Sequence, residues 1–195
     1  LGRNQFLPFQ IVQDDMMDTI FNVIFTDTQL HFFGNEQKAF TIHGICDSAW
    51  GYTSEKTLTE IMNPNALISK DFFIYNDGIS NGYTDLKYSF STKGVLNAAE
   101  VSFRNFSDKT LEDPDGRIVV FNAPPDKKFE VDTNTQIIKL YYYDSESSSW
   151  IPDTLSALSY MTDKNWIRLV PGMNHLGVYA ILEYFSITYK FTRGI

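Results

Sequence analysis

The chain has 195 residues, of which 43% are hydrophobic and 15% aromatic, and its formal net charge is −8. This composition supplies enough apolar side chains for a folded core and excludes a disordered chain. Only 16 Lys and Arg residues are present, and the acidic balance argues against nucleic acid as a partner. The longest apolar runs, such as "VYAIL", have five residues, whereas a spanning helix needs about 20, so we expect no transmembrane segment in this chain.

Cys46 is the only cysteine, so the chain can form neither an internal disulfide nor a cysteine-based zinc site. The three histidines, His31, His43 and His175, are far apart in the sequence, whereas transition-metal ligands usually show local spacing. We therefore expect no metal and no other cofactor. The chain begins with Leu1 and lacks a signal peptide, which predicts a processed or excised piece of a longer protein.

The predicted elements, in chain order, are mostly strands. "DDMMDTIFNVIF", within the first 26 residues, is compatible with a helix or with a buried strand. One short helix is predicted over residues 53–62, "TSEKTLTEIM", because its apolar residues share one helical face and a proline follows. The other segments are rich in β-branched and aromatic residues, and several alternate with period two. These predicted strands are residues 37–45, 71–75, 85–91, 100–106, 117–122, 136–144, 165–170 and 177–191.

Polar turn clusters separate these strands at intervals of 10 to 20 residues, with no regular helices between them. This spacing favours a sandwich over a parallel α/β architecture. The predicted fold class is therefore mainly β: an antiparallel β-sandwich with at most one or two short helices. We expect two parts, a β-rich part over residues 1–95, which is a candidate subdomain, and a sandwich part over residues 96–195.

The turn "NDGISNGYTD" combines several oxygen ligands, Asn76, Asp77, Asn81 and Asp85, that are candidates for holding calcium. It lacks the glutamate at the twelfth position of the helix-loop-helix calcium motif. The alternative is a solvated polar turn with glycine at positive φ.

Two further features have both a functional and a structural interpretation. Asn105 begins an Asn-Phe-Ser triplet, which has the form of an N-glycosylation acceptor. Tyr141, Tyr143 and Trp166 are candidate stacking faces for a sugar. The alternative for the tyrosine run is alternation between core and surface on a strand, with Trp150 in the core.

The last third of the chain contains an ordered set of short segments: "LYYYD", "SESSSW", "NWIRLV" and "NHLGVYAIL". Their order resembles the GPS motif, the C-terminal part of the GAIN domain of adhesion receptors and polycystin-like proteins, over about residues 98–185. That motif combines four cysteines, an Asp and a Trp with a final His-Leu-Thr-x-Phe-Ala-x-Leu. The matching residues are Asp144, Trp150, His175, Leu176, Ala180 and Leu182, with Tyr179 in place of the Phe.

The departures from the motif bear on chemistry. The four family cysteines are absent, with Leu140 and Met173 at two of their positions, and Gly177 stands where the family has Thr or Ser. In the family that hydroxyl attacks the preceding carbonyl while the histidine takes its proton. The resemblance therefore implies a degenerate cleavage site at His175, Leu176 and Gly177, with the Leu176–Gly177 bond intact. Gly177 itself fits a bulge or a close backbone approach.

We therefore expect a non-enzymatic extracellular module with a structural or protein-interaction role within a larger cell-surface protein or assembly. Its location would be extracellular or at the cell surface. Its partners would be other domains or subunits of that assembly, contacted through strand edges and exposed aromatics. The alternative function is a carbohydrate-binding module that uses the exposed aromatics.

Overall fold

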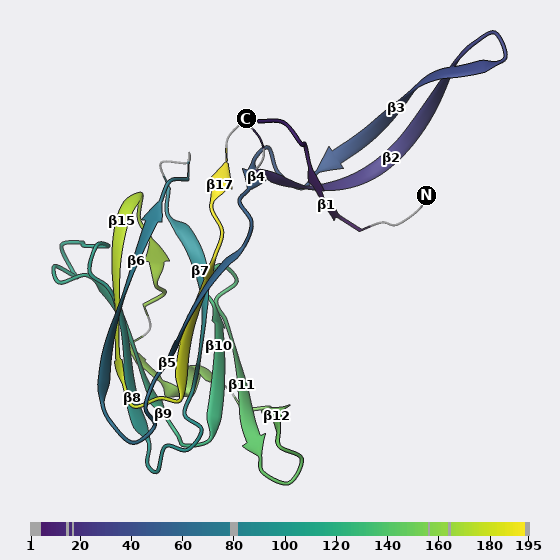
Figure 1. Ribbon diagram of the computed structural model, residues 1–195. Coiled ribbons are helices and arrows are strands. Elements are labelled where there is room, and N and C mark those ends of the chain that lie inside the picture. Colours follow the sequence, from purple (N-terminus) through teal and green to yellow (C-terminus); the bar gives the residue numbers. More distant parts are fainter. Residues whose placement is uncertain are drawn as a thin grey trace. The chain divides into compact units, whose positions relative to one another are not determined.

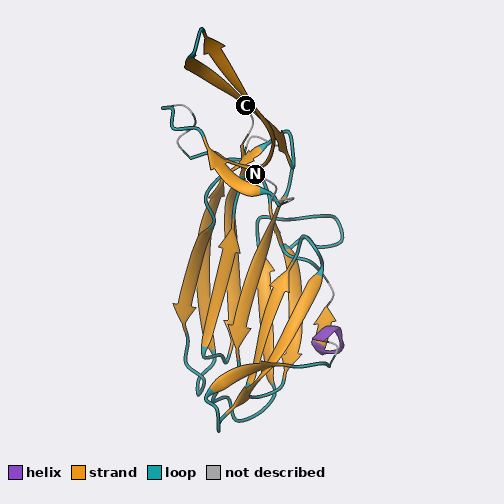
Figure 2. Ribbon diagram, turned by 90° about the vertical axis from the view of Figure 1, so that its right-hand side faces the viewer, coloured by secondary structure: helices purple, strands orange, loops and turns teal. Residues whose placement is uncertain are grey.

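The computed structural model describes residues 5–14, 16, 18–78, 82–155, 157–163 and 165–193. Over these residues the regular elements are strands, apart from the short 3-10 helix η1 (Ala157–Tyr160) (Figure 2). All pairings of the described strands are antiparallel. The predicted fold class is confirmed. None of the described helical segments has the length and apolar character required to cross a membrane.

The chain divides into two compact units. Unit 1 comprises Leu1–Ser54 and Thr192–Ile195, and unit 2 comprises Glu55–Phe191 (Figure 1). This division differs from the expected boundary at residues 95 and 96, because strands from both sides of that point pair with one another. For example, β6 (Ile68–Asn76) pairs along its whole length with β15 (Gly172–Ala180).

Unit 2 is a sandwich of two sheets. Sheet B has the strand order β12-β11-β10-β7-β16-β5, with β14 paired to β7, and sheet C has the order β13-β9-β8-β15-β6. Besides β6 and β15, the strands are β5 (Lys56–Ile61), β7 (Thr84–Ser91), β8 (Ala99–Asn105), β9 (Arg117–Ala123), β10 (Lys127–Asp132), β11 (Ile137–Asp144), β12 (Ser149–Pro152), β13 (Met161–Asp163), β14 (Arg168–Leu169) and β16 (Tyr184–Tyr189).

Aromatic side chains from both sheets form the centre of the unit 2 core. The strands alternate buried and accessible residues, as in β8, so each sheet turns one face inward. Phe185 of sheet B lies with its ring centroid 4.9 Å from that of Phe103 of sheet C, and Phe90 lies 5.3 Å from Phe121. All four side chains are fully buried, which gives unit 2 a large apolar contribution to stability.

The predicted helix over residues 53–62 is wrong, because Lys56–Ile61 forms strand β5 at the edge of sheet B. The Thr57 and Thr59 hydroxyls lie 3.0 and 2.8 Å from hydroxyls of their cross-strand partners on β16. Leu58 packs against the core on the opposite face. Apolar residues compatible with a helical face are thus equally compatible with a strand, and pairing with β16 decides between the two.

Unit 1 contains sheet A, with the strand order β1-β2-β4-β17 and with β3 paired to β2. Its strands are β1 (Leu7–Gln10), β2 (Ile20–Phe33), β3 (Glu36–Cys46), β4 (Gly51–Tyr52) and β17 (Thr192–Arg193). Strand β2 resolves the ambiguity of "DDMMDTIFNVIF" in favour of a strand over its apolar part. Strands β2 and β3 form a long hairpin that turns at Gly34, whose φ of 66° suits glycine.

Candidate functional site

His175 lies on the outer face of sheet C, held by two rings and one carboxylate. Its ring stacks on Phe73 with centroids 4.8 Å apart, and Phe106 lies at 4.7 Å. Its Nε2 is 2.9 Å from Oδ1 of Asp71. The side chain is 40% exposed, so His175 is partly accessible rather than enclosed. These contacts give it a packing role on the sheet surface.

Gly177 makes room for the Phe106 ring. A Cβ atom at Gly177 would lie 2.7 Å from Cε2 of Phe106 and 3.4 Å from Oδ1 of Asp71. Gly177 pairs in regular register with Asp71 on β6 and Arg104 on β8, so the strand has no bulge there, and the group that approaches Gly177 closely is the Phe106 side chain rather than backbone. Phe106 was not recognised from the sequence, because its contact with Gly177 joins residues far apart in the chain. The intact Leu176–Gly177 bond stays a prediction.

The candidate calcium turn is built around Asn76, which is buried. Its Oδ1 accepts a hydrogen bond from the Gly78 backbone N–H at 3.1 Å. Its Nδ2 donates to Thr84 Oγ1 at 3.2 Å and to the Val170 carbonyl at 3.3 Å. The side chain thus ties the start of the turn to β7 and to the segment after β14, and its oxygen is already used within the turn.

The other members of that turn are dispersed. Asp77 follows β6, Asp85 lies on β7, and Asn81 lies outside the described residues. Burial raises the pKa of Asp85, Asp132 raises it further, and Arg168 opposes the shift. No three His, Cys, Asp or Glu side chains of the described residues come together as metal ligands. Calcium binding at this turn stays a prediction.

The structure argues against glycosylation at Asn105, which is fully buried. Its Nδ2 donates to the Arg168 carbonyl at 2.7 Å and to Asn174 Oδ1 at 2.9 Å. Its Oδ1 accepts from the Ser107 backbone N–H at 3.0 Å. The amide of the folded chain is therefore occupied by internal hydrogen bonds that join β8, β14 and β15.

Tyr141 and Tyr143 lie on the same outer face of sheet B, whereas Trp166 packs against the core of unit 2. The Tyr141 hydroxyl donates to Glu130 Oε2 at 3.0 Å. Trp150 is half-buried and meets Tyr143 edge-on, with centroids 5.3 Å apart, so the expectation that Trp150 lies in the core is wrong. The structure brings together two of the three candidate stacking residues.

The hairpin of unit 1 has an apolar face that was not anticipated from the sequence. We define the apolar hairpin face as four side chains that are 49% to 61% exposed: Leu30, Phe32, Phe40 and Ile42. Leu30 is the direct cross-strand partner of Phe40. The opposite face is polar, and there the Nε2 atom of His31 lies 2.8 Å from Oγ1 of Thr41. His43 pairs with Asp27 on that face.

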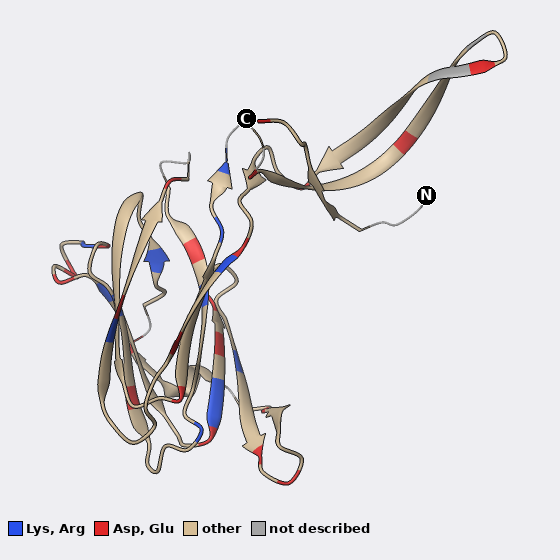
Figure 3. Cartoon of the chain, in the orientation of Figure 1, with Lys and Arg blue, Asp and Glu red and all other residues tan. Residues whose placement is uncertain are grey.

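An apolar groove of about 480 Å³ continues from the apolar hairpin face at the base of the hairpin. Phe9 of β1, Phe25 of β2 and Ile42 of β3 contribute to its lining. The rings of Phe9 and Phe25 meet edge-on with centroids 5.7 Å apart. Figure 3 shows that the described part of the hairpin carries few charges. Unit 1 therefore presents an extended apolar surface over β2 and β3.

No protein-family model matches the chain, and no curated protein sequence matches it. Its fold is similar to the crystal structure of the SPP1 Dit (gp 19.1) protein, described as a paradigm of the hub adsorption apparatus in phages that infect Gram-positive bacteria. The TM-score is 0.52 and the identity 15%, and the match covers 98% of this chain and 67% of that chain. At this identity the likeness shows the fold alone.

This likeness overturns the resemblance to the GAIN domain and its GPS motif. The segments that suggested the motif belong to different sheets: Asp144 and Trp150 flank the β11–β12 turn of sheet B, whereas His175 lies on β15 of sheet C. Alternating aromatic strands and polar turns recur in sandwich proteins, so their order along the chain does not identify this family.

Proposed function

We propose that this chain is a non-enzymatic structural subunit of an adsorption-hub type of assembly, in which unit 1 contacts neighbouring copies of the chain. The observation that carries the proposal is the apolar hairpin face, together with the groove at its base. The similarity in fold to SPP1 Dit, which spans nearly the whole chain, supports a role as one subunit of such a hub.

The small size of unit 1 limits its stability. A two-stranded hairpin is marginally stable by itself, and small units bury too little of their surface to be stable alone. Burying one large apolar side chain contributes about 1.5–3 kcal/mol. The four side chains of the apolar hairpin face therefore represent a large free energy that is gained only when another surface covers them. Extended apolar patches of this kind mark interaction sites.

A second copy of the chain is the occupant that we propose. Among the described strands, β3 pairs only with β2, so its outer edge is open to strand addition by a neighbour. Each copy would carry the same hairpin and the same groove, and soluble homo-oligomers usually close by symmetry. Neighbouring copies could thus cover every apolar hairpin face in a closed ring.

The test is the oligomeric state of the purified chain, measured by light scattering and by negative-stain electron microscopy. The expected result is a closed ring-shaped oligomer that Leu30→Glu/Phe40→Glu converts to folded monomers. Leu96→Glu/Leu111→Glu is the matched control, because these leucines of unit 2 are 84% and 102% exposed, and it should leave the ring intact. A wild-type chain that stays monomeric at its highest soluble concentration contradicts the proposal. The extracellular or cell-surface location stays a prediction.

A further inference from the structure

The outer face of sheet B carries a groove of about 490 Å³, a volume within the range of small-molecule sites. Strand register places its side chains in two parallel rows. The first row contains Asp132, Lys87 and Thr188, and the second contains Lys139, Glu130 and Ser89. The groove thus combines hydroxyl, carboxylate and ammonium groups over adjacent strands.

The charges in the groove nearly cancel. Its carboxylates are those of Glu55, Glu130 and Asp132, and its ammonium groups are those of Lys87 and Lys139. Figure 3 shows both signs along β7, β10 and β11. A near balance with a slight negative excess disfavours polyanions and offers little attraction for strong cations. The ligand that complements this surface is neutral and rich in groups that both donate and accept hydrogen bonds.

Glu130 is fixed in position before any ligand arrives. Lys128 Nζ lies 2.6 Å from Glu130 Oε1, and the Tyr141 hydroxyl donates to Oε2. Burial raises the pKa of Glu130, but the hydrogen bonds from Lys128 and Tyr141, together with the positive charges of Lys128 and Lys139, outweigh burial and place its pKa below the ordinary value. The carboxylate is therefore a charged acceptor at neutral pH whose orientation costs little to fix on binding.

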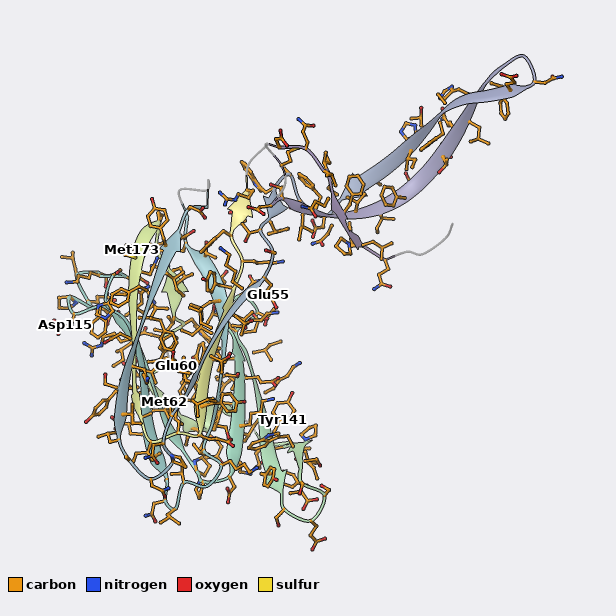
Figure 4. All side chains as sticks on the ribbon, in the orientation of Figure 1. Glu55, Glu60, Met62, Asp115, Tyr141 and Met173 are labelled. Carbon is orange, nitrogen blue, oxygen red and sulfur yellow. The ribbon has the colours of Figure 1, made fainter. Side chains whose placement is uncertain are left out.

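Aromatic side chains border the polar rows on the same face. Tyr141, labelled in Figure 4, follows Lys139 by two residues along β11 and lies on the same face of the strand. Tyr184 of β16 is partly buried and lies next to Ser91 of β7 in the strand register. Small-molecule sites typically combine apolar surface with a few fixed polar groups, and tyrosine, which offers both an apolar ring and a polar tip, lies beside this groove.

We propose that this groove binds a neutral oligosaccharide, with Glu130 accepting hydrogen bonds from sugar hydroxyls and with Ser89 and Lys139 supplying flanking contacts. Sugar hydroxyls donate and accept hydrogen bonds, as the mixed lining requires. The site lies entirely in unit 2, so it does not depend on assembly through the apolar hairpin face. A variant that loses sugar binding can still be tested for assembly, and one that loses assembly can still be tested for sugar binding.

The test is a titration of the isotope-labelled full chain, followed by backbone amide shifts, with maltotetraose, cellotetraose and chitotetraose as neutral probes. Polyglycerol phosphate serves as the anionic probe. At least one neutral probe should shift amides of β7 and β10 and saturate. Glu130→Gln should weaken that binding about tenfold or more, as loss of a charge-assisted hydrogen bond does, and Lys139→Ala should weaken it measurably.

Glu112→Gln and Lys109→Ala are matched controls at exposed positions away from the groove, and they should leave the affinity unchanged. Thermal unfolding of each variant checks its fold. If Glu130→Gln is destabilised, Lys139→Ala still tests the groove, because Lys139 is exposed. Three outcomes overturn the proposal: no neutral probe shifts the groove, polyglycerol phosphate alone does so, or the control variants lose binding equally.

Discussion

The two units differ in how they bury their apolar side chains. Unit 2 encloses aromatic residues from both sheets, such as Phe103 and Phe185, at 0% exposure. Unit 1 buries Phe21 and Val23 near β4 but leaves Leu30 and Phe40 more than half exposed. Unit 2 thus has a complete core of its own, whereas the hairpin of unit 1 does not bury its apolar face within its own unit.

The largest expected effect is on folding of the separated units. Residues 55–191 produced alone should unfold in one cooperative transition, because the core of the sandwich lies within them. Residues 1–54 alone should show no such transition, because a two-stranded hairpin lacks sufficient buried surface. Urea denaturation followed by circular dichroism measures both. A cooperatively folded monomer of residues 1–54 would remove the basis of the comparison.

Two phenylalanine substitutions, one in each unit, should differ in their effect on the stability of the single chain. Phe185→Ala should lower the free energy of unfolding by about 3–5 kcal/mol, since it empties a fully buried site. Phe40→Ala removes a side chain that is 60% exposed in the single chain, and it should change monomer stability by about 0.5 kcal/mol or less. Its effect should appear instead as a shift of the oligomer toward smaller species in light scattering.

The sequence predicted most strands of unit 2, because alternation of apolar and polar residues is a local property. It did not distinguish β5 from a helix, where Leu58 and Met62 satisfy both periodicities and only the partner strand β16 decides. Nor did it show that the apolar residues of the hairpin stay exposed: "AFTIHGI" alternates like any half-buried strand, and alternation does not say which molecule covers the apolar face.

The candidate sites depend even more than the fold on contacts between residues that are far apart in the sequence. Asn105 looked accessible as a triplet but is enclosed by Arg168 and Asn174. The groove on sheet B joins β7, β10, β11 and β16 with Glu55, which precedes β5, and no sequence spacing connects these segments. Tyr141 was recognised as a candidate ligand residue, but its partner Glu130 emerged only from the register of β10 and β11.

An intermediate effect is expected at Gly177, where the structure assigns a packing role. Gly177→Ala places a Cβ atom against Phe106, and the ring must swing away from His175. Unfolding free energy should fall by about 1 kcal/mol, without a change in oligomeric state. In the Phe106→Ala background, Gly177→Ala should lower the unfolding free energy by a much smaller amount. An undiminished cost in that background would contradict the packing role of Gly177.

The smallest expected effect is that of Glu130 on the unfolding free energy, and it should concern unit 2 alone. Burial raises the pKa of Glu130, but the hydrogen bonds from Lys128 and Tyr141 and the charges of Lys128 and Lys139 together lower it in the folded chain, so its carboxylate stabilises the fold above the unfolded pKa of about 4.3. That contribution disappears as the pH falls through the lower folded pKa.

Glu130→Gln should therefore reduce the unfolding free energy at neutral pH by about 0.5 kcal/mol, the scale of a partly exposed ion pair. The difference from wild type should shrink toward zero in acid, below the lowered pKa of Glu130 in the folded chain, where both chains carry an uncharged side chain. Urea titrations of both chains at the two pH values measure it, with Glu112→Gln as the control. A difference that persists in acid would mean that Glu130 acts through packing rather than charge. The oligomeric state should be the same for all three chains, because Glu130 lies in the unit whose core is complete.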